Sequence, residues 1–140
     1  MHLQLSEEQQ FIQDTARRFA TDELAPIAEK LDAGEGRELL LANLQKLADL
    51  GFMGLNINGD YGGTEAGSVA FSVALTELGR ACASTAVTVS VTNMVGEVIQ
   101  ACGTEQQKQN YLPKLCSGEY PAGGFCLTES VAGSDPAGMK

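Results

Sequence analysis

The longest apolar stretch of the chain runs from Ser84 to Cys102, and it restricts the possible folds more than any other feature of the sequence. It approaches the length of a membrane-spanning helix. Polar side chains interrupt it at Thr88, Thr92, Asn93, Glu97 and Gln100. A lipid-facing helix carries such groups only at a high energetic cost. The stretch therefore predicts a buried helix in the core of a globular domain, rather than a membrane span.

A second helix signal stands near the start of the chain. Ser6 is followed three residues later by Gln9, the capping-box pattern in which each side chain satisfies a free backbone N–H of the other residue. A largely apolar stripe at helical spacing follows, made of Phe11, Ile12, Thr15, Ala16 and Phe19. Pro26 removes one helical hydrogen bond, so we expect a kink or a new first turn between Asp22 and Pro26.

The segment that follows contains another helix and then a loop. Gly34 and Gly36 interrupt the first helical pattern. Leucines at helical spacing then predict a helix that ends at Leu50-Gly51 in the usual glycine-terminated way. Residues 52–57 are apolar but few, which leaves a strand or an extended link open, whereas the glycine-rich residues 58–67 are typical of a loop.

Two more helices flank the long apolar stretch. Residues 68–80 are apolar nearly all round, which indicates burial on more than one side. Thr104 and Gln107 form another capping-box pattern, which opens a polar helix that reaches about Leu115. From Ala122 the pattern changes, because residues 123–128 are typical of a strand and residues 132–136 of a turn.

These segments predict an all-α fold, an up-and-down helical bundle of five to six helices. We expect residues 1–121 to form this helical domain and residues 122–140 to begin a β domain with its first strand. An unpaired strand at the end of a chain favours aggregation. We therefore expect the natural protein to continue beyond Lys140 with the rest of a truncated β domain.

Charge and residue counts exclude several classes of function. The formal net charge is −9 and the nine lysines and arginines are scattered, whereas nucleic-acid binding needs a clustered basic surface. The four cysteines have no metal-binding spacing, and His2 is the only histidine. A metal site or a Ser/His catalytic pair is therefore not expected. Reduced thiols packed as small apolar groups suit a reducing intracellular compartment, and no secretory signal is expected.

The segment from Phe125 to Asp135 is the best candidate for a binding site. A strand followed by a turn of small residues offers free backbone N–H groups that can hold a planar heterocycle and an adjacent phosphate. The Thr128 hydroxyl can donate to or accept from a ring nitrogen. Gly133 allows a close backbone approach, and Ser134 can donate to a phosphate oxygen. Such turns are common, however, and the residues alone favour an ordinary strand end.

The same segment, Phe125-Cys-Leu-Thr-Glu-Ser-Val-Ala-Gly-Ser-Asp135, resembles the flavin-contacting signature of the acyl-CoA dehydrogenase family. Family-like stretches also occur in the right order along essentially the whole chain. They are residues 5–9, 47–52, 61–63, 77–80, 103–108, 111–115 and 117–119. Ser130 departs from the family pattern, which has a proline there, and leaves the turn less rigid.

The resemblance implies an FAD site in the second half of the chain. Phe125, Leu127 and Thr128 would line the flavin, with the Thr128 hydroxyl bonded to the ring edge near its reactive nitrogen. Gly133 and Ser134 would lie near the pyrophosphate.

The resemblance also implies a substrate site and indicates what this chain lacks. Thr88, Val91 and Val95 would line the acyl-chain pocket, although plain core packing explains them as well. Glu129 is not expected to be catalytic, since the family's base is a carboxylate in a later helical domain. We therefore expect no catalytic residue in this chain, and the chain alone to be inactive.

For the complete protein, the resemblance implies α,β-dehydrogenation of an acyl-CoA thioester. The electrons would pass to an electron-transferring flavoprotein, and the enzyme would be a homotetramer or homodimer in the cytoplasm or, in a eukaryote, the mitochondrial matrix. A related acyl-CoA oxidase that delivers electrons to oxygen is one alternative. A non-catalytic helical interaction module is the other.

Overall fold

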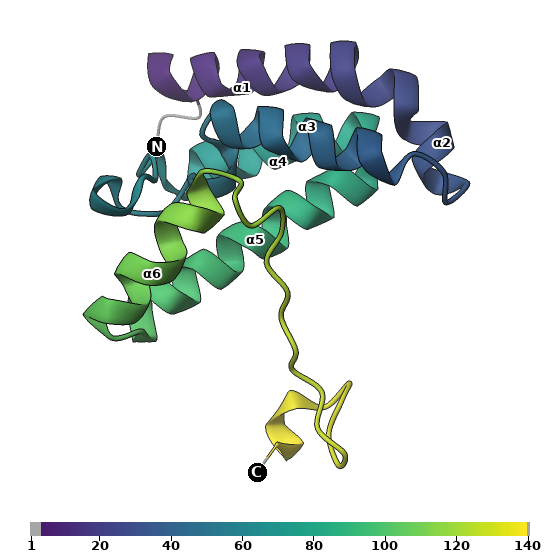
Figure 1. Cartoon of the computed structure of the whole chain (residues 1–140). Coiled ribbons are helices and arrows are strands. Elements are labelled where there is room, and N and C mark those ends of the chain that lie inside the picture. The colour runs from purple at the N-terminus through teal and green to yellow at the C-terminus, as the bar shows by residue number, and fades with distance from the viewer. Residues whose placement is uncertain (1–3, 140) are drawn as a thin grey trace.

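The apolar stretch at residues 84–102 forms most of α5, the longest helix of a helical bundle (Figure 1). The computed structural model describes residues 4–139. Its α-helices are α1 (Glu7–Phe19), α2 (Ala28–Asp32), α3 (Arg37–Asp49), α4 (Gly67–Ala81), α5 (Ala83–Cys102) and α6 (Glu105–Cys116). The predicted all-α bundle is confirmed. No helix of residues 4–139 is both long enough and apolar enough to cross a membrane.

Shorter helical turns connect these helices. They are η1 (Ala20–Leu24, a π-helical turn), η2 (Ala25–Ile27), η3 (Phe52–Gly54), η4 (Gly59–Tyr61) and η5 (Pro136–Gly138). The change in helix type at η1 and η2 confirms the irregularity predicted near Pro26, which lies in η2 and cannot donate a backbone hydrogen bond. Gly34 and Gly36, both with positive φ, separate α2 from α3 as predicted.

The two predicted capping boxes form as expected. At the start of α1, the Gln9 amide donates to the Ser6 Oγ at 3.2 Å, and the Ser6 amide donates to the Gln9 side chain at 3.0 Å. Thr104 and Gln107 make the same reciprocal pair ahead of α6. The apolar stripe of α1 is correct only in part, because Phe11 points away from the core and is 68% exposed.

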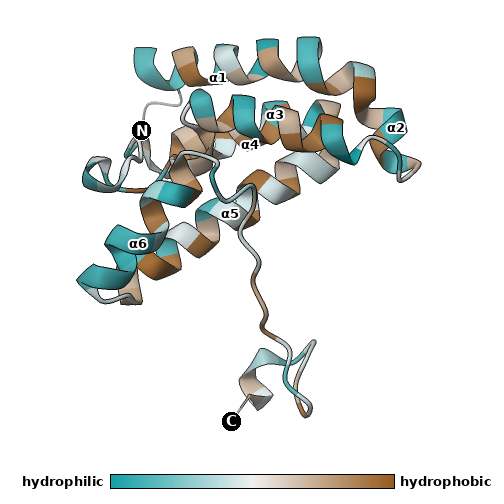
Figure 2. Ribbon diagram, viewed as in Figure 1, coloured by the Kyte–Doolittle hydropathy of each residue, from teal (hydrophilic) through white to brown (hydrophobic). Residues whose placement is uncertain are grey.

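Helix α4 packs against α1 on one side and α5 on the other, as its nearly all-round apolar surface predicts. Ala70, Ala74 and Leu78 are fully buried at these contacts. Val69 lies on the remaining, exposed side. Figure 2 shows that α4 and α5 are mostly hydrophobic along their length, whereas α6 is mostly hydrophilic.

Residues 52–57 are neither a strand nor an extended link, so both predicted alternatives are wrong. Gly51 ends α3 with a φ of 82°, and the buried 3-10 turn η3 follows directly. The loop at residues 58–67 folds back onto this segment, and the Glu65 amide donates to the Ile57 carbonyl at 3.1 Å. A Cβ atom on Gly63 would lie 2.0 Å from the same carbonyl oxygen, so this close approach requires glycine.

The predicted strand at residues 123–128 does not form. The backbone there is extended, but it pairs with no other strand in residues 4–139. The tail, residues 121–139, instead leaves the bundle beside α5 and ends in a small turn (Figure 1). Since a strand exists only by pairing with a neighbour, the alternating pattern alone could not produce one.

Candidate functional site

Polar side chains of α5 bind the backbone of η3 and of the residues that follow it. The fully buried Asn93 accepts from the Leu55 amide at 2.8 Å and donates to the Phe52 carbonyl at 2.9 Å. Farther along α5, Gln100 accepts from the Asn58 amide at 2.7 Å. These bonds hold η3 and the residues after it against α5. The polar residues that argued against a membrane span therefore have a structural role.

The predicted acyl-pocket residues Thr88, Val91 and Val95 lie along one side of α5. All three are half-buried, whereas the side of α5 that carries Val89 and Asn93 is fully buried. The Thr88 hydroxyl donates to the Ser84 carbonyl of the same helix at 2.9 Å. These three residues are thus not plain core.

An apolar strip borders these three residues on α5. It consists of Val87, Met94 and Val98, which are 61%, 39% and 44% exposed. A solvent-facing row of this kind on a long helix is suited to forming one wall of an apolar site.

A tight turn organises the predicted flavin-binding residues. Glu129 and Ala132 form an antiparallel bridge, in which the Glu129 amide donates to the Ala132 carbonyl at 2.8 Å. This turn brings the residues on either side of it together, so that a Cβ atom on Gly133 would lie 3.5 Å from the Thr128 methyl group. Ala132 is buried beneath the turn, and η5 follows it.

The remaining predicted flavin contacts are accessible. Phe125 and Leu127 are each 47% exposed on the extended part of the tail, and Ser134 is exposed after the turn. Thr128, Gly133 and Ser134 thus gather at one turn. The tail carries this turn away from α5, so the two predicted sets lie on separate parts of the chain (Figure 1).

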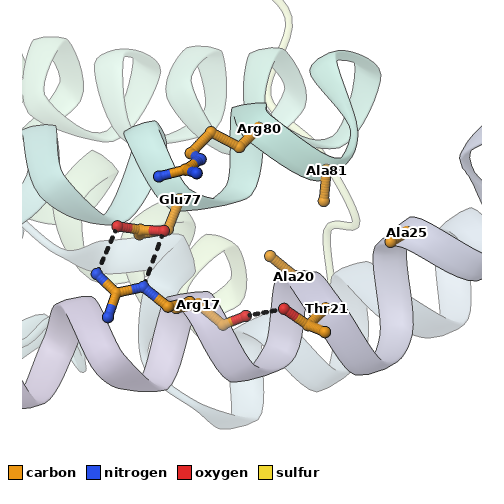
Figure 3. A pocket seen from close by; sticks show the side chains of 7 residues that line it. All are labelled: Arg17, Ala20, Thr21, Ala25, Glu77, Arg80 and Ala81. Carbon is orange, nitrogen blue, oxygen red and sulfur yellow. Dashed lines mark hydrogen bonds and ion pairs between the residues drawn. The ribbon is translucent and has the colours of Figure 1, made fainter.

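One charged cluster was not identified from the sequence. Glu77 of α4 is buried and accepts two hydrogen bonds from the Arg17 guanidinium of α1, at 2.9 Å to Nη2 and 3.3 Å to Nε (Figure 3). Gln13 donates a third at 3.1 Å. Arg80 lies on the far side of Glu77 and lines the same cleft of about 340 Å³. The sequence signals were an acidic residue on a largely apolar helix and its place in the family-like stretch at residues 77–80.

The electrostatics of this cluster indicate a structural ion pair. The hydrogen bonds from Arg17 lower the pKa of Glu77, and they outweigh burial, which acts in the opposite direction. A carboxylate held ionised by a bidentate partner is a poor proton acceptor at neutral pH. The cluster therefore joins α1 to α4 and is not a candidate general base.

The cysteines divide into two buried and two exposed thiols. Cys82 and Cys116 are buried, and burial raises the pKa of Cys116 to about 11. Cys102 and Cys126 are exposed. Residues 4–139 contain no group of three or more His, Cys, Asp or Glu side chains placed to hold a metal ion.

Known proteins share this sequence and fold. The model for the acyl-CoA dehydrogenase N-terminal domain matches residues 6–119. The chain is 36% identical over its whole length both to the acryloyl-CoA reductase (NADH) of Anaerotignum propionicum and to a probable acyl-CoA dehydrogenase of Bacillus subtilis. It spans 35% and 36% of these two proteins, about a third of their length.

Solved structures give the same result. Butyryl-CoA dehydrogenase of Megasphaera elsdenii aligns with all of the chain at a TM-score of 0.83 and 31% identity, over 37% of its own length. A Bacillus anthracis acyl-CoA dehydrogenase complexed with FAD aligns with 97% of the chain at 0.85 and 29% identity, over 23% of its own length. A chain from work on the electron-transferring flavoprotein of Acidaminococcus fermentans aligns with 98% at 0.86 and 34% identity, over 36% of its own length. The described bundle and the order of its motifs agree with these matches, and the chain belongs to the acyl-CoA dehydrogenase family.

Proposed function

We propose that this chain is the N-terminal part of a flavin-dependent acyl-CoA dehydrogenase that introduces an α,β double bond into an acyl-CoA thioester. Residues 1–121 form its helical domain, and residues 122–140 begin its middle β domain. The observation that carries this proposal is the turn at residues 129–132, which places Thr128 beside Gly133 within a family-like flavin signature.

The tail has features that suit FAD. Phe125 and Leu127 offer exposed apolar surface that a planar ring can cover, and the Thr128 hydroxyl can bond to the ring edge. The described tail carries acidic but no basic side chains. The pyrophosphate would therefore be bound by the backbone N–H groups near Gly133 and by the Ser134 hydroxyl. When bound, FAD supplies the acceptor for the hydride that leaves the β-carbon.

Helix α5 contributes the wall of the acyl pocket. Val91 and Val95, with Thr88 beside them, present apolar surface that keeps water away from the reacting thioester. Removal of a weakly acidic α-proton requires a polarised carbonyl in a water-poor site. We assign no catalytic residue to this chain, since Glu77 is committed to Arg17 and Glu129 belongs to the bridge that shapes the tail turn.

The proposed partners follow from the same family membership. They are an acyl-CoA substrate, an electron-transferring flavoprotein as electron acceptor, and further copies of the same protein in a dimer or tetramer. We place the protein in the cytoplasm or the mitochondrial matrix. Dehydrogenation is the favoured direction, although the relative from Anaerotignum propionicum is named for reduction of acryloyl-CoA by NADH.

The test uses the chain extended to the length of its relatives. Its visible spectrum is recorded without oxygen, before and after addition of acyl-CoAs of increasing chain length. A bound-flavin spectrum that bleaches with one chain-length class is the expected result, and it also identifies the substrate. A colourless protein that FAD does not reconstitute would leave only an interaction module.

Two further measurements separate the alternatives that share the flavin. Rapid oxygen uptake during turnover identifies an oxidase, and bleaching by NADH with reoxidation by an enoyl-CoA identifies a reductase. A Thr128→Val variant is expected to bind FAD more weakly. The same change at Thr76, which is exposed on α4, serves as its matched control.

A further inference from the structure

The extended tail is fixed to α5 at Gly123. The Gly123 amide donates to the Thr92 hydroxyl at 3.0 Å, and that hydroxyl donates to the Thr88 carbonyl at 2.8 Å. Thr92 is fully buried beneath this contact. One side chain of α5 therefore links the helix that carries the proposed acyl wall to the start of the proposed flavin segment.

A side chain at position 123 would be crowded against α5. A Cβ atom there would lie 3.0 Å from the Val95 Cβ and 3.2 Å from the Thr92 Cα, which are tight contacts against a helix. At Gly124 nothing lies within 4 Å of the corresponding atom. The two adjacent glycines thus differ in their surroundings. Neither has a side chain, so size alone would allow either of them to pack against α5.

A slip between these glycines would have a large effect on the tail. Successive residues of an extended chain face opposite sides, so a shift by one residue turns every following side chain to the other face. Phe125 and Leu127 would exchange places with Cys126 and Thr128. After such a slip the Gly124 amide would stand opposite Thr92, so the register depends on which of the two amides Thr92 holds. In the structure it holds the Gly123 amide.

We propose that Thr92 is a positioning residue that sets the register of the flavin-binding segment by holding the Gly123 amide on α5. This role rests on the proposed function, and it adds a specific coupling between the acyl wall and the flavin site. A change at Val95 or Thr92 is then transmitted to the tail through the contact with Gly123, without any contact with the flavin itself.

Amide hydrogen exchange in the 140-residue chain, measured by NMR, tests the contact directly. Loss of the hydroxyl in Thr92→Val is expected to speed exchange at Gly123 by about tenfold, the effect of losing one hydrogen bond. Thr92→Ser keeps the hydroxyl and is expected to restore protection. Thr76→Val removes a similar hydroxyl-to-carbonyl bond within α4 and leaves Gly123 unchanged. The Leu55 amide, held by Asn93, reports in each variant that the bundle is folded. Unchanged Gly123 exchange in a folded Thr92→Val variant overturns the proposal.

The register itself is tested by the contacts of the Val95 methyl groups. In Thr92→Val, proton contacts with these methyl groups are expected to spread from Gly123 to Gly124, whereas Thr92→Ser and Gly124→Ala leave them at Gly123. Contacts confined to Gly123 in a folded Thr92→Val variant contradict the proposal.

The flavin-bearing protein supplies the functional readout. There Gly123→Ala and Thr92→Val are expected to shift the flavin absorption spectrum, while Gly124→Ala and Thr92→Ser are not. If no variant binds flavin but Gly123 exchange responds as expected, the contact holds and the proposed function fails. If flavin binds and Gly123 exchange does not respond, the proposed function stands and the register role fails.

Discussion

The helical bundle and the tail satisfy their backbone groups in different ways. In the bundle, buried side chains reach backbone groups far away in the sequence, as Asn93 does with Phe52 and Leu55. In the tail, the turn closes on itself through the bridge between Glu129 and Ala132. The bundle also has fully buried leucines, such as Leu47 and Leu78, whereas the tail leaves Phe125 and Leu127 half exposed.

This difference indicates which part of the chain contributes most to its stability. The bundle has the long-range contacts that define one conformation, and these contacts cross between elements distant in sequence. The tail has local contacts and an attachment to α5 at Gly123, with apolar surface left over. Substitutions in the bundle should therefore change the free energy of unfolding, while matched substitutions in the tail should leave it nearly unchanged.

The largest contrast is expected between two glycines. Gly63→Ala places a Cβ atom against the Ile57 carbonyl and breaks the bond between Ile57 and Glu65, so it should lower the free energy of unfolding by about 4 kcal/mol or more. Gly133→Ala in the tail meets only an ordinary 3.5 Å contact and should leave stability unchanged. Urea denaturation measures the free energy of unfolding of both variants. Equal values would contradict the contrast between the bundle and the tail.

A smaller contrast is expected between two leucines. Leu47 of α3 is fully buried, so Leu47→Ala should cost about 3 kcal/mol through lost burial and the cavity left behind. Leu127→Ala removes the same atoms from a half-exposed position and should cost no more than about 0.5 kcal/mol. If Leu127→Ala cost as much as Leu47→Ala, the tail would have a core of its own.

The hydrogen bonds of Asn93 on α5 give a further contrast. Asn93→Ala leaves the Leu55 amide and the Phe52 carbonyl buried without their partner, which should cost about 2 kcal/mol. Asn110→Ala changes an exposed residue of α6 and should have little effect. Thermal unfolding followed by circular dichroism at 222 nm measures both variants, and a neutral Asn93→Ala would show that η3 does not depend on this amide.

The smallest effect concerns pH and the pair between Arg17 and Glu77. Because the folded pKa of Glu77 is lowered, its stabilising contribution is fully present above the ordinary glutamate pKa of 4.5 and is lost as pH falls through the folded value. Glu77→Gln should be less stable than the wild type at pH 7 and should lose less stability on acidification below pH 4.5.

Glu119→Gln is the control for this measurement, since Glu119 pairs with Lys114 on an exposed surface. It should retain the acid dependence of the wild type. If the free energy of unfolding depended on pH in the same way in the wild type and in Glu77→Gln, the ion pair between Arg17 and Glu77 would not contribute to stability.

Elements with local signals were predicted correctly from the sequence. The capping boxes at Ser6 and Thr104 and the glycine end of α3 at Gly51 involve residues within a few positions of one another. Their hydrogen bonds close within one helical turn, so the sequence pattern contains all the partners. Pro26 acts equally locally, through its missing N–H group.

Elements that depend on distant partners could not be predicted in this way. Residues 52–54 turn because Asn93, about 40 positions later, binds their backbone. Glu77 is a structural residue because Arg17 lies opposite it, 60 positions earlier. The predicted strand failed for the same physical reason, since no partner strand lies within residues 4–139. The proposed flavin-binding residues rest on a family resemblance, and their arrangement around the tail turn depends on a bridge that no periodicity indicates.

The distribution of the cysteines allows a distance within this chain to be measured. Cys102 at the end of α5 and Cys126 on the tail are open to labelling reagents, whereas Cys82 and Cys116 are sealed in the interior. A pair of spin labels can therefore be attached to the natural sequence, one on each of the two regions, without engineering. The distribution of distances between the two labels measures how rigidly the tail is held at its attachment to α5.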